Sequence, residues 1–257
     1  MPCKFNTLKE RVDRGERLIG LWSSLTSATA VEVLSTTDYD WLLLDMEHAP
    51  NSLGDIIDQL RVPDSSQVSG FVRPPGNDRV TIKRLLDAGA KNLLFPYVEN
   101  VGQAQDIIHA TRYAPAGARG VSTAGRAARY GQQPGYLADA AREIVIAIQI
   151  ETVQALESIP EFTSLPENDI LFFGPADLSA DMGHLGEPEH PRVKAAIVEG
   201  IRQTEAAGKM AGVLAPNMDL ASDYYKAGAR LIAIGSDIQC LRSAAAAALA
   251  TARTRLA

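Results

Sequence analysis

The feature that most constrains the fold is a series of eight short apolar or β-branched runs spread along the chain. Several runs are continuously apolar rather than alternating, as expected for parallel strands that are covered on both faces. The runs occupy residues 18–25, 41–45, 69–74, 92–98, 144–151, 169–175, 210–216 and 231–237. Amphipathic segments typical of helices separate them. Eight strands alternating with helices in 257 residues predict an α/β fold, the (β/α)8 TIM barrel.

The segments between the runs support this topology. Helical patterns cover 78–90, 101–114 and 191–208. Three predicted helices end in an Ala-Gly pair directly before the next strand, as a glycine C-cap requires. These pairs are Ala88-Gly89, Ala207-Gly208 and Ala227-Gly228. The main alternative, a doubly wound open sheet, usually needs fewer strands and a G-x-G-x-x-G turn after the first strand, which is absent. No linker or repeat divides the chain, so we predict one domain over residues 1–257.

Composition excludes several classes of partner. The net charge is -6 with acidic and basic residues interspersed, so no basic surface for nucleic acid or for a membrane is expected. The apolar run at 244–250 is too short to cross a bilayer, and the first ten residues lack the apolar centre of a signal peptide. The two cysteines, Cys3 and Cys240, lie far apart in the sequence. A reduced cytoplasmic protein is the expectation.

Polar side chains collect where the predicted strands end. The active sites of TIM barrels lie at the carboxyl ends of the strands. Gln149 and Glu151 end the fifth strand with a two-residue spacing that directs both to one face. Six residues are therefore expected to converge on one rim: Asp45, His48, Arg73, Gln149, Glu151 and Asp177. Glu47 lies beside them and could be structural or could tune Arg73.

Each of these residues also has an ordinary structural explanation. Asp45 and Asp177 could cap the helices that follow them, and Glu151 could favour a helix N-terminus through its charge. Arg73 could be a salt-bridge partner for any of these acids. The convergence of four strand ends favours a functional site instead. His48 is the histidine expected to act in it. His109 is expected on the surface or in a groove of a helix. His184 and His190 are expected in a solvated loop, although a loop after the sixth strand could reach the site.

Two further features bear on the chemistry. No lysine follows a predicted strand; Lys91 and Lys209 precede strands, which disfavours a Schiff-base mechanism. Glu151 and Asp177 instead offer the carboxylate pair that a hard cation such as Mg²⁺ or Mn²⁺ prefers, whereas Zn²⁺ would require more His or Cys ligands. The glycine- and arginine-rich segment 115–140 is expected to be a functional loop.

The order and spacing of five motifs resemble the HpcH/HpaI family of metal-dependent (class II) pyruvate aldolases. The motifs are "LLLDMEHAP", "VRP", "RYAPAGARGV", "QIET" and "GPADLSADMG", and the similarity extends from "GLWSSL" to "GSD". The set is specific, although each motif alone would be a weak signal. Met46 occupies a position that is often glycine in such relatives, which bears on aldehyde specificity more than on reaction type.

The resemblance implies a TIM-barrel lyase that reversibly cleaves a 4-hydroxy-2-oxo acid to pyruvate and an aldehyde through a metal-bound pyruvate enolate. It implies that Glu151 and Asp177 ligate the metal, that Arg73 contacts the pyruvate oxygen, and that His48 paired with Asp45 transfers the proton. Mg²⁺ or Mn²⁺ is the expected cofactor, with Co²⁺ as a third candidate. The expected substrate contacts are Arg73, Gln149, Gly174, Pro175, Ala176, Asp177, Leu214 and Trp22. Independently of the resemblance, Arg119 and Arg126 in the glycine-rich segment could bind a distal carboxylate of a diacid substrate or could be structural.

Three other functions remain open at this level. An oxaloacetate decarboxylase would need the same metal chemistry without the base, and a citramalyl- or malyl-CoA-type lyase would need a basic surface for CoA. A non-catalytic metabolite-binding barrel would have no use for a proton-transfer group. The sequence does not specify the aldehyde, the stereochemistry, the preferred metal or the pathway.

The last segment, 239–256, predicts an alanine-rich helix. It could be an ordinary eighth barrel helix. The resemblance implies instead that this helix is exchanged between subunits of a homo-hexamer, a dimer of trimers, and that Asp87 of a neighbouring subunit approaches the site.

Overall fold

The computed structural model describes residues 6–256 and contains a closed barrel of eight parallel strands that pair in sequence order. Every strand lies inside its predicted run, so the TIM-barrel prediction is confirmed. The strands are β1 (Leu18–Ser23), β2 (Trp41–Asp45), β3 (Ser69–Arg73), β4 (Asn92–Phe95), β5 (Val145–Ile150), β6 (Ile170–Phe173), β7 (Met210–Leu214) and β8 (Leu231–Ser236). Residues 1–5, which include Cys3 and half of the ten residues expected to lack a signal peptide, lie outside the described residues.

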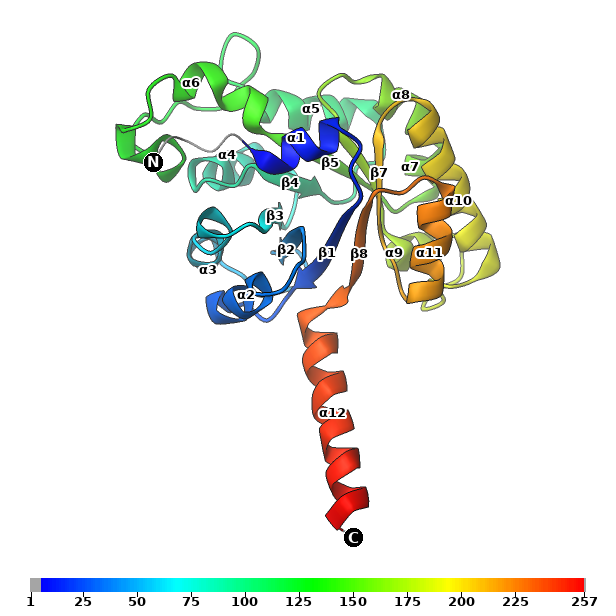
Figure 1. Ribbon diagram of the computed structural model, residues 1–257. Helices are drawn as coiled ribbons and strands as arrows, with labels where there is room; N and C mark the ends of the chain where they lie inside the picture. Colours follow the sequence, from blue (N-terminus) through cyan, green and yellow to red (C-terminus); the bar gives the residue numbers. More distant parts are fainter. Residues whose placement is uncertain (1–5, 257) are drawn as a thin grey trace.

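Helices cover the outside of the barrel (Figure 1). They are α1 (Thr7–Asp13), α2 (Ala28–Ser35), α3 (Leu53–Leu60), α4 (Arg79–Asp87), α5 (Val101–Thr111), α6 (Tyr136–Asp139), α7 (Val153–Glu157), α8 (Ile159–Ser164), α9 (Pro175–Asp181), α10 (Pro191–Ala206), α11 (Met218–Ala227) and α12 (Asp237–Leu256). Short 3-10 turns cover Pro63–Ser65, Arg126–Gly131 and Ala140–Glu143. Gly89 and Gly228 follow α4 and α11 with φ of 99° and 125°, which confirms the expected left-handed helix ends.

Large aromatic side chains fill the interior of the barrel. Trp22, Trp41 and Phe172 lie within ring-centroid distances of 5.7 to 6.5 Å of one another. Glycine on a neighbouring strand makes the space: a Cβ on Gly20 would lie 2.2 Å from the indole of Trp41. A second apolar layer between strands and helices contains Leu42, among many others, and both layers hold the strand ends in register.

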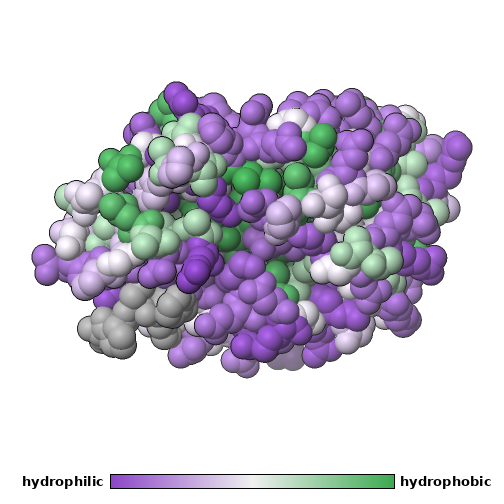
Figure 2. Space-filling view, turned by 90° about the horizontal axis from the view of Figure 1, so that it is seen from above, coloured by the Kyte–Doolittle hydropathy of each residue, from purple (hydrophilic) through white to green (hydrophobic). Residues whose placement is uncertain are grey.

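All strands point the same way, so their carboxyl ends share one end of the barrel, here called the carboxyl face. This is the end from which α12 leaves in Figure 1. The opposite end, the amino face, is viewed directly in Figure 2 and is covered mostly by hydrophilic residues. Residues 112–144 connect α5 to β5 and therefore lie on the amino face. The expected functional loop 115–140 therefore lies away from the carboxyl ends of the strands, because a helix-to-strand connection returns to the amino end of a barrel.

Helix α12 extends away from the barrel instead of packing on it (Figure 1). Asp237 is its one buried residue among those described, and the apolar side chains of Ile238, Leu241 and Leu249 are 48%, 61% and 53% exposed. The alternative of an ordinary eighth barrel helix is therefore wrong. Its small alanine side chains offer little apolar area to hold it against its own barrel. Within residues 6–256, no helix has both the length and the apolar character needed to span a bilayer.

Candidate active site

Asp45 and Arg73 form a buried ion pair on the carboxyl face. They are register partners at the ends of β2 and β3, and they are 1% and 5% exposed. Arg73 donates from Nε to Oδ1 of Asp45 at 2.9 Å and from Nη2 to Oδ2 at 2.7 Å. Burial alone would raise the pKa of Asp45, but the hydrogen bonds and charge of Arg73 outweigh it, so this pKa is lowered. The pair is an ionised, two-pronged salt bridge that fixes the guanidinium plane.

The structure does not pair His48 with the side chain of Asp45, as the resemblance implied. Both carboxylate oxygens of Asp45 accept hydrogen bonds from Arg73, and Oδ1 also accepts one from the backbone N–H of Glu47 at 3.0 Å. The His48 side chain is 65% exposed, and its Nε2 lies 3.8 Å from Oε2 of Glu47. A planar guanidinium on the adjacent strand matches a buried carboxylate better than an imidazole on the exposed turn beyond β2.

Glu47 joins this arrangement from the other side of Arg73. Its Oε2 lies 2.8 Å from Nη1 of Arg73, so the guanidinium is held between two carboxylates. Burial raises the pKa of Glu47, and the nearby charge of Asp177 adds to the effect, although Arg73 opposes it. The indole of Trp22 lies 5.2 Å from the Arg73 guanidinium carbon and packs on the cation. Glu47 thus contacts Arg73 directly. This contact fits the expectation that Glu47 could tune Arg73.

Glu151 follows β5 and is 1% exposed. Its Oε1 accepts a hydrogen bond from the backbone N–H of Tyr97 at 2.7 Å, and its Oε2 accepts one from Nε2 of Gln149. Burial raises the pKa of Glu151 to about 7, and the negative charges of Glu47 and Asp177 contribute in the same direction. A buried carboxylate near two others is stabilised by a bound cation.

The turn from β6 into α9 completes the site. A Cβ on Gly174 would lie 3.0 Å from both Nε2 of Gln149 and Oε2 of Glu151, so a larger residue here would force these side-chain ends to shift by a few tenths of an ångström. Oε1 of Gln149 is buried and has no hydrogen-bond partner within residues 6–256. Asp177 is half-buried in the first turn of α9; Gly174, not Asp177, is the N-cap residue.

The turn formed by residues 174–177 has fewer free backbone N–H groups for binding an anion than its length of four residues suggests. The N–H of Gly174 donates to the carbonyl of Ile150 at 3.0 Å, and Pro175 has no N–H. Ala176 and Asp177 are therefore the residues whose N–H groups suit a substrate carboxylate. Leu214 ends β7, half-buried against the interior cluster that contains Trp22, so both predicted apolar contacts lie at carboxyl ends of strands.

Tyr97 is a site residue that the sequence reasoning missed. The predicted strand 92–98 ends early at Phe95, and Tyr97 adopts φ of 53°. This left-handed conformation, which costs a non-glycine residue on the order of 1–3 kcal/mol, turns its N–H onto Glu151. No pattern in "NLLFPYVEN" indicates it, because the contact depends on the backbone rather than on the tyrosine side chain.

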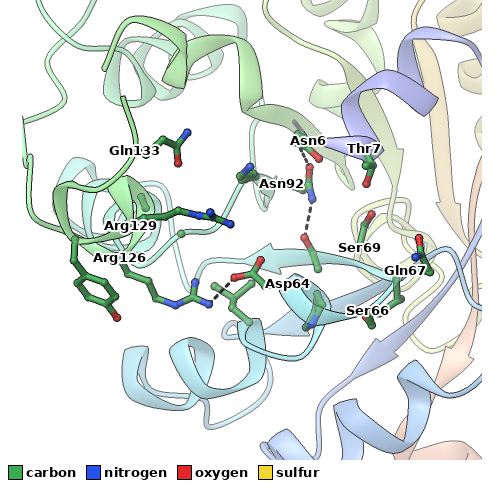
Figure 3. A pocket seen from close by; sticks show the side chains of 18 residues that line it. Asn6, Thr7, Asp64, Ser66, Gln67, Ser69, Asn92, Arg126, Arg129 and Gln133 are labelled. Atoms are coloured by element: carbon green, nitrogen blue, oxygen red, sulfur yellow. Dashed lines mark hydrogen bonds and ion pairs between the residues drawn. The ribbon is translucent and has the colours of Figure 1, made fainter. Parts of the chain in front are cut away.

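Arg119 and Arg126 lie on the amino face, so the expectation that they bind a distal carboxylate is wrong within a single chain. Arg119 donates from Nη2 to Oδ1 of Asp87 at 2.9 Å. Arg126 donates to the carbonyl of Ala88 at 2.9 Å and to Oδ2 of Asp64 at 2.6 Å. Figure 3 shows Arg126 and Asp64 lining a cavity of about 350 Å³ at this end of the barrel. An approach of Asp87 to the site of a neighbouring subunit stays a prediction.

The fold and the site together define a class. A closed parallel barrel carries a buried arginine–carboxylate pair and a desolvated group of acids at the carboxyl ends of its strands, which is the arrangement of a TIM-barrel enzyme. Residues 18–244 match the family described as HpcH/HpaI aldolase/citrate lyase, and the chain belongs to this family, a family of carbon–carbon lyases.

Individual relatives agree with this assignment. The chain is 44% identical over 243 residues to a 4-hydroxy-2-oxo-heptane-1,7-dioate aldolase of Klebsiella pneumoniae, covering 94% of this chain and 92% of that protein. It is 38% identical to an HpcH/HpaI aldolase/citrate lyase family protein of Burkholderia cenocepacia, with a TM-score of 0.93 over 96% of this chain and 99% of that one. An HpcH/HpaI aldolase of Desulfitobacterium hafniense gives a TM-score of 0.86 at 28% identity, covering 95% of each chain.

Proposed function

We propose that the protein cleaves 4-hydroxy-2-oxo acids reversibly to pyruvate and an aldehyde with the help of a divalent metal ion. The observation that carries the proposal is Glu151: it is 1% exposed, its pKa is raised to about 7, and the carboxylates of Glu47 and Asp177 lie near it. The names of the relatives support the same reaction, and 4-hydroxy-2-oxo-heptane-1,7-dioate is the first substrate to test.

The residues at the end of β5 and the start of α9 fit a hard cation. Glu151 and Asp177 supply carboxylate oxygens, the unpartnered Oε1 of Gln149 supplies a further polar atom near them, and the missing Cβ of Gly174 leaves room. Glu151 and Asp177 would hold the ion. Mg²⁺ or Mn²⁺ suits these oxygen ligands best, with Co²⁺ as a third candidate. When bound, the ion would polarise the keto group of the substrate and stabilise negative charge on its oxygen.

Arg73 is oriented to stabilise the same developing charge. Two of its N–H groups are hydrogen-bonded to Asp45 and its Nη1 lies 2.8 Å from Glu47, so a guanidinium with five N–H groups keeps donors for a substrate oxygen. Because the salt bridge holds the guanidinium before the substrate arrives, little reorganisation is needed when charge grows on the pyruvate oxygen.

His48 is proposed to move the proton of the aldol hydroxyl. Its ring lies at the exposed edge of the site with Nε2 3.8 Å from Glu47, so it can reach a substrate that enters from solvent. In this arrangement Asp45 acts through Arg73, and Glu47 is the carboxylate that faces the imidazole. The apolar side chains of Trp22 and Leu214 would contact the substrate beside Arg73.

The remaining proposals concern the assembly and the alternatives. We propose a cytoplasmic homo-oligomer, a hexamer built as a dimer of trimers, in which α12 packs on a neighbouring subunit. The exposed apolar residues of that helix support this arrangement. Oxaloacetate decarboxylation is expected as a side activity, because it needs the same charge stabilisation without the base. No observation favours a CoA-ester lyase or a non-catalytic barrel over the aldolase.

The decisive experiment couples pyruvate release from 4-hydroxy-2-oxo-heptane-1,7-dioate to lactate dehydrogenase. We expect turnover that EDTA abolishes and that Mg²⁺ or Mn²⁺ restores, and we expect Glu151→Gln to stay inactive with added metal. A panel of 4-hydroxy-2-oxo acids that differ at the far end would define the aldehyde. Turnover that persists in EDTA, or no pyruvate from any member of the panel, would overturn the proposal.

A further inference from the structure

The loop that joins α9 to α10, residues 182–190, contains two of the four histidines of the chain. We call it the histidine loop. His184, Glu187 and His190 each offer one ligand atom, and these atoms lie within 4.8 Å of one another. Among residues 6–256, this is the one group of three or more His, Cys, Asp or Glu side chains close enough to share an ion. Both histidines were expected in a solvated loop that could reach the active site.

The two imidazole rings are already stacked. Their centroids are 3.6 Å apart and their planes are inclined by 15°. Imidazole nitrogens bind a metal through lone pairs in the ring plane, so the two rings would tilt out of this parallel arrangement to share an ion. The half-buried rings and the exposed Glu187 carboxylate form an open-sided cluster of two nitrogens and one oxygen.

The backbone of the histidine loop holds the three residues in place. The N–H of His184 donates to the carbonyl of Ser179 at 2.7 Å, which ties the loop to the end of α9. The N–H of Glu187 donates to the carbonyl of His184, and that of His190 to the carbonyl of Glu187, both at 2.9 Å. Two successive turns thus place the residues three positions apart, so the backbone of the loop is already folded before an ion binds.

We propose that His184, Glu187 and His190 form a second divalent-metal site that takes a borderline transition ion of the Zn²⁺ type. Imidazole nitrogens favour Zn²⁺, Ni²⁺ or Cu²⁺, whereas Mg²⁺ prefers oxygen ligands and a regular octahedral shell. Two histidines and one glutamate are a ligand set that Zn²⁺ uses with a water at the open fourth position. The two sites of the protein therefore select different ions by the chemistry of their ligands.

One contact competes with this site. Nδ1 of His190 accepts a hydrogen bond from the N–H of Arg192 at 3.2 Å, which caps the first turn of α10. An ion bound through Nδ1 would replace this bond directly, and one bound through Nε2 would place a proton on Nδ1 and break it. The N–H of Arg192 lies at the exposed surface, where water can take over the bond.

The proposed site is separate from the carboxylate pair of the aldolase site, and it does not depend on the proposed function. His184 lies seven positions after Asp177 and three positions beyond Asp181, the last residue of α9, so the two sites share no residue. The two positions are nevertheless mechanically linked, because α9 carries Asp177 at one end and the histidine loop at the other, and α9 packs against α10 (Figure 1). An ion in the histidine loop would stiffen the element that presents Asp177.

The test uses the full-length protein with Glu151→Gln and Asp177→Asn, which removes the proposed aldolase metal site. Zn²⁺ is titrated by equilibrium dialysis in excess Mg²⁺, and Cu²⁺ is used in parallel so that its electron paramagnetic resonance spectrum reports nitrogen ligands. We expect one equivalent of Zn²⁺ per chain, a raised melting temperature with Zn²⁺, and nitrogen couplings in the Cu²⁺ spectrum. Binding should weaken as the pH falls, since protons compete for the imidazoles.

Adding His184→Ala with His190→Ala should weaken Zn²⁺ binding by at least about 100-fold, because loss of even an outer partner of a metal ligand costs roughly 10–100-fold. Glu187→Gln, which keeps the loop shape, should weaken it less. His109→Ala on the exposed surface of α5 is the matched control and should leave binding unchanged. No bound equivalent in the Glu151→Gln/Asp177→Asn protein, or binding that survives loss of both loop histidines, would overturn the proposal, whatever the aldolase assay reports.

Discussion

Arg73 and Asp45 are joined by two parallel hydrogen bonds across the carboxyl ends of β2 and β3, at 2.9 and 2.7 Å, and neither side chain is more than 6% exposed. Glu47 closes on the same guanidinium from the other side at 2.8 Å. This relationship changes the expected role of Asp45. Asp45 positions the arginine that is proposed to face the substrate. The imidazole of His48 instead lies near Glu47 and is exposed to solvent.

Asp45→Ala should therefore damage both stability and activity. Removing one partner of a buried pair leaves an uncompensated charge, which costs about 3–5 kcal/mol. Urea unfolding measures the stability loss, and kcat/KM for aldol cleavage should fall with it. The control is Asp58→Ala, which breaks the exposed pair between Asp58 and Arg61 and should cost less than about 1 kcal/mol. Equal effects of the two substitutions would contradict the structural role of the Asp45–Arg73 pair.

His48→Ala should separate proton transfer from metal binding. Because the His48 side chain is 65% exposed, the melting temperature and metal affinity should stay close to those of the parent protein. Aldol turnover should fall about 10²–10⁴-fold, the usual effect of losing a positioned acid–base group. Steady-state kinetics and calorimetry measure the two quantities. A fully active His48→Ala enzyme would show that the base lies elsewhere, and His109→Ala serves as the control for histidine removal.

Glu151 should make the metal-free protein less stable as the pH rises. Its pKa is about 7 in the folded chain, above the ordinary 4.5, so the folded state binds the proton more tightly than the unfolded state does. The stabilisation is complete below pH 4.5 and is lost as the pH rises through about 7; for a shift of this size it amounts to about 3 kcal/mol.

Urea unfolding in EDTA at pH 5 and pH 8 tests this sign. The parent protein should lose more stability over this interval than Glu151→Gln, which cannot ionise there. Adding Mg²⁺ or Mn²⁺ at pH 8 should restore the parent and not the variant, since the ion favours the charged carboxylate. A pH dependence that is identical in the two proteins would mean that Glu151 titrates normally.

Gly174→Ala should weaken metal binding and also destabilise the fold. The new Cβ would lie 3.0 Å from Gln149 and from Glu151, so the Glu151 carboxylate must shift. We expect about 1–3 kcal/mol of destabilisation from overpacking and a tenfold or greater loss of Mn²⁺ affinity, measured by calorimetry. Gly76→Ala is the control, because no heavy atom beyond its chain neighbours lies within 4 Å of the position of its Cβ. Unchanged Mn²⁺ affinity in Gly174→Ala would argue against a metal at Glu151.

Local patterns were enough to predict most of the barrel. The run "WLLLD" predicts β2 from Trp41 to Asp45 exactly as observed, and the Ala-Gly pairs predict where α4 and α11 end. Such features follow from burial on both faces and from the backbone freedom of glycine, which act over a few residues. The rim residues were likewise predictable, because parallel strands bring their ends to one face whatever the details of packing.

Pairing between distant residues was not predictable in the same way. The sequence contains Asp45, Glu47, His48 and Arg73 but does not say which acid faces which base. The register of β2 against β3 decides that Asp45 meets Arg73. Residues 115–140 follow a predicted helix and precede a predicted strand. Because such connections lie at the amino end of a barrel, the face on which this loop lies was predictable from the sequence. No residue pattern around Tyr97 predicts its left-handed backbone conformation.

The amino-acid sequence by itself determined the strand and helix order, the barrel, and the set of ionisable residues at its carboxyl face, since these depend on hydrophobic periodicity and strand direction. Only the tertiary structure decided that Arg73 is clamped by two acids, that Glu151 is desolvated, that α12 leaves its own barrel, and that His184 and His190 stack. The physical reason is that burial, charge pairing and close ring contact are properties of side chains brought together across the fold, and no local pattern encodes their distances.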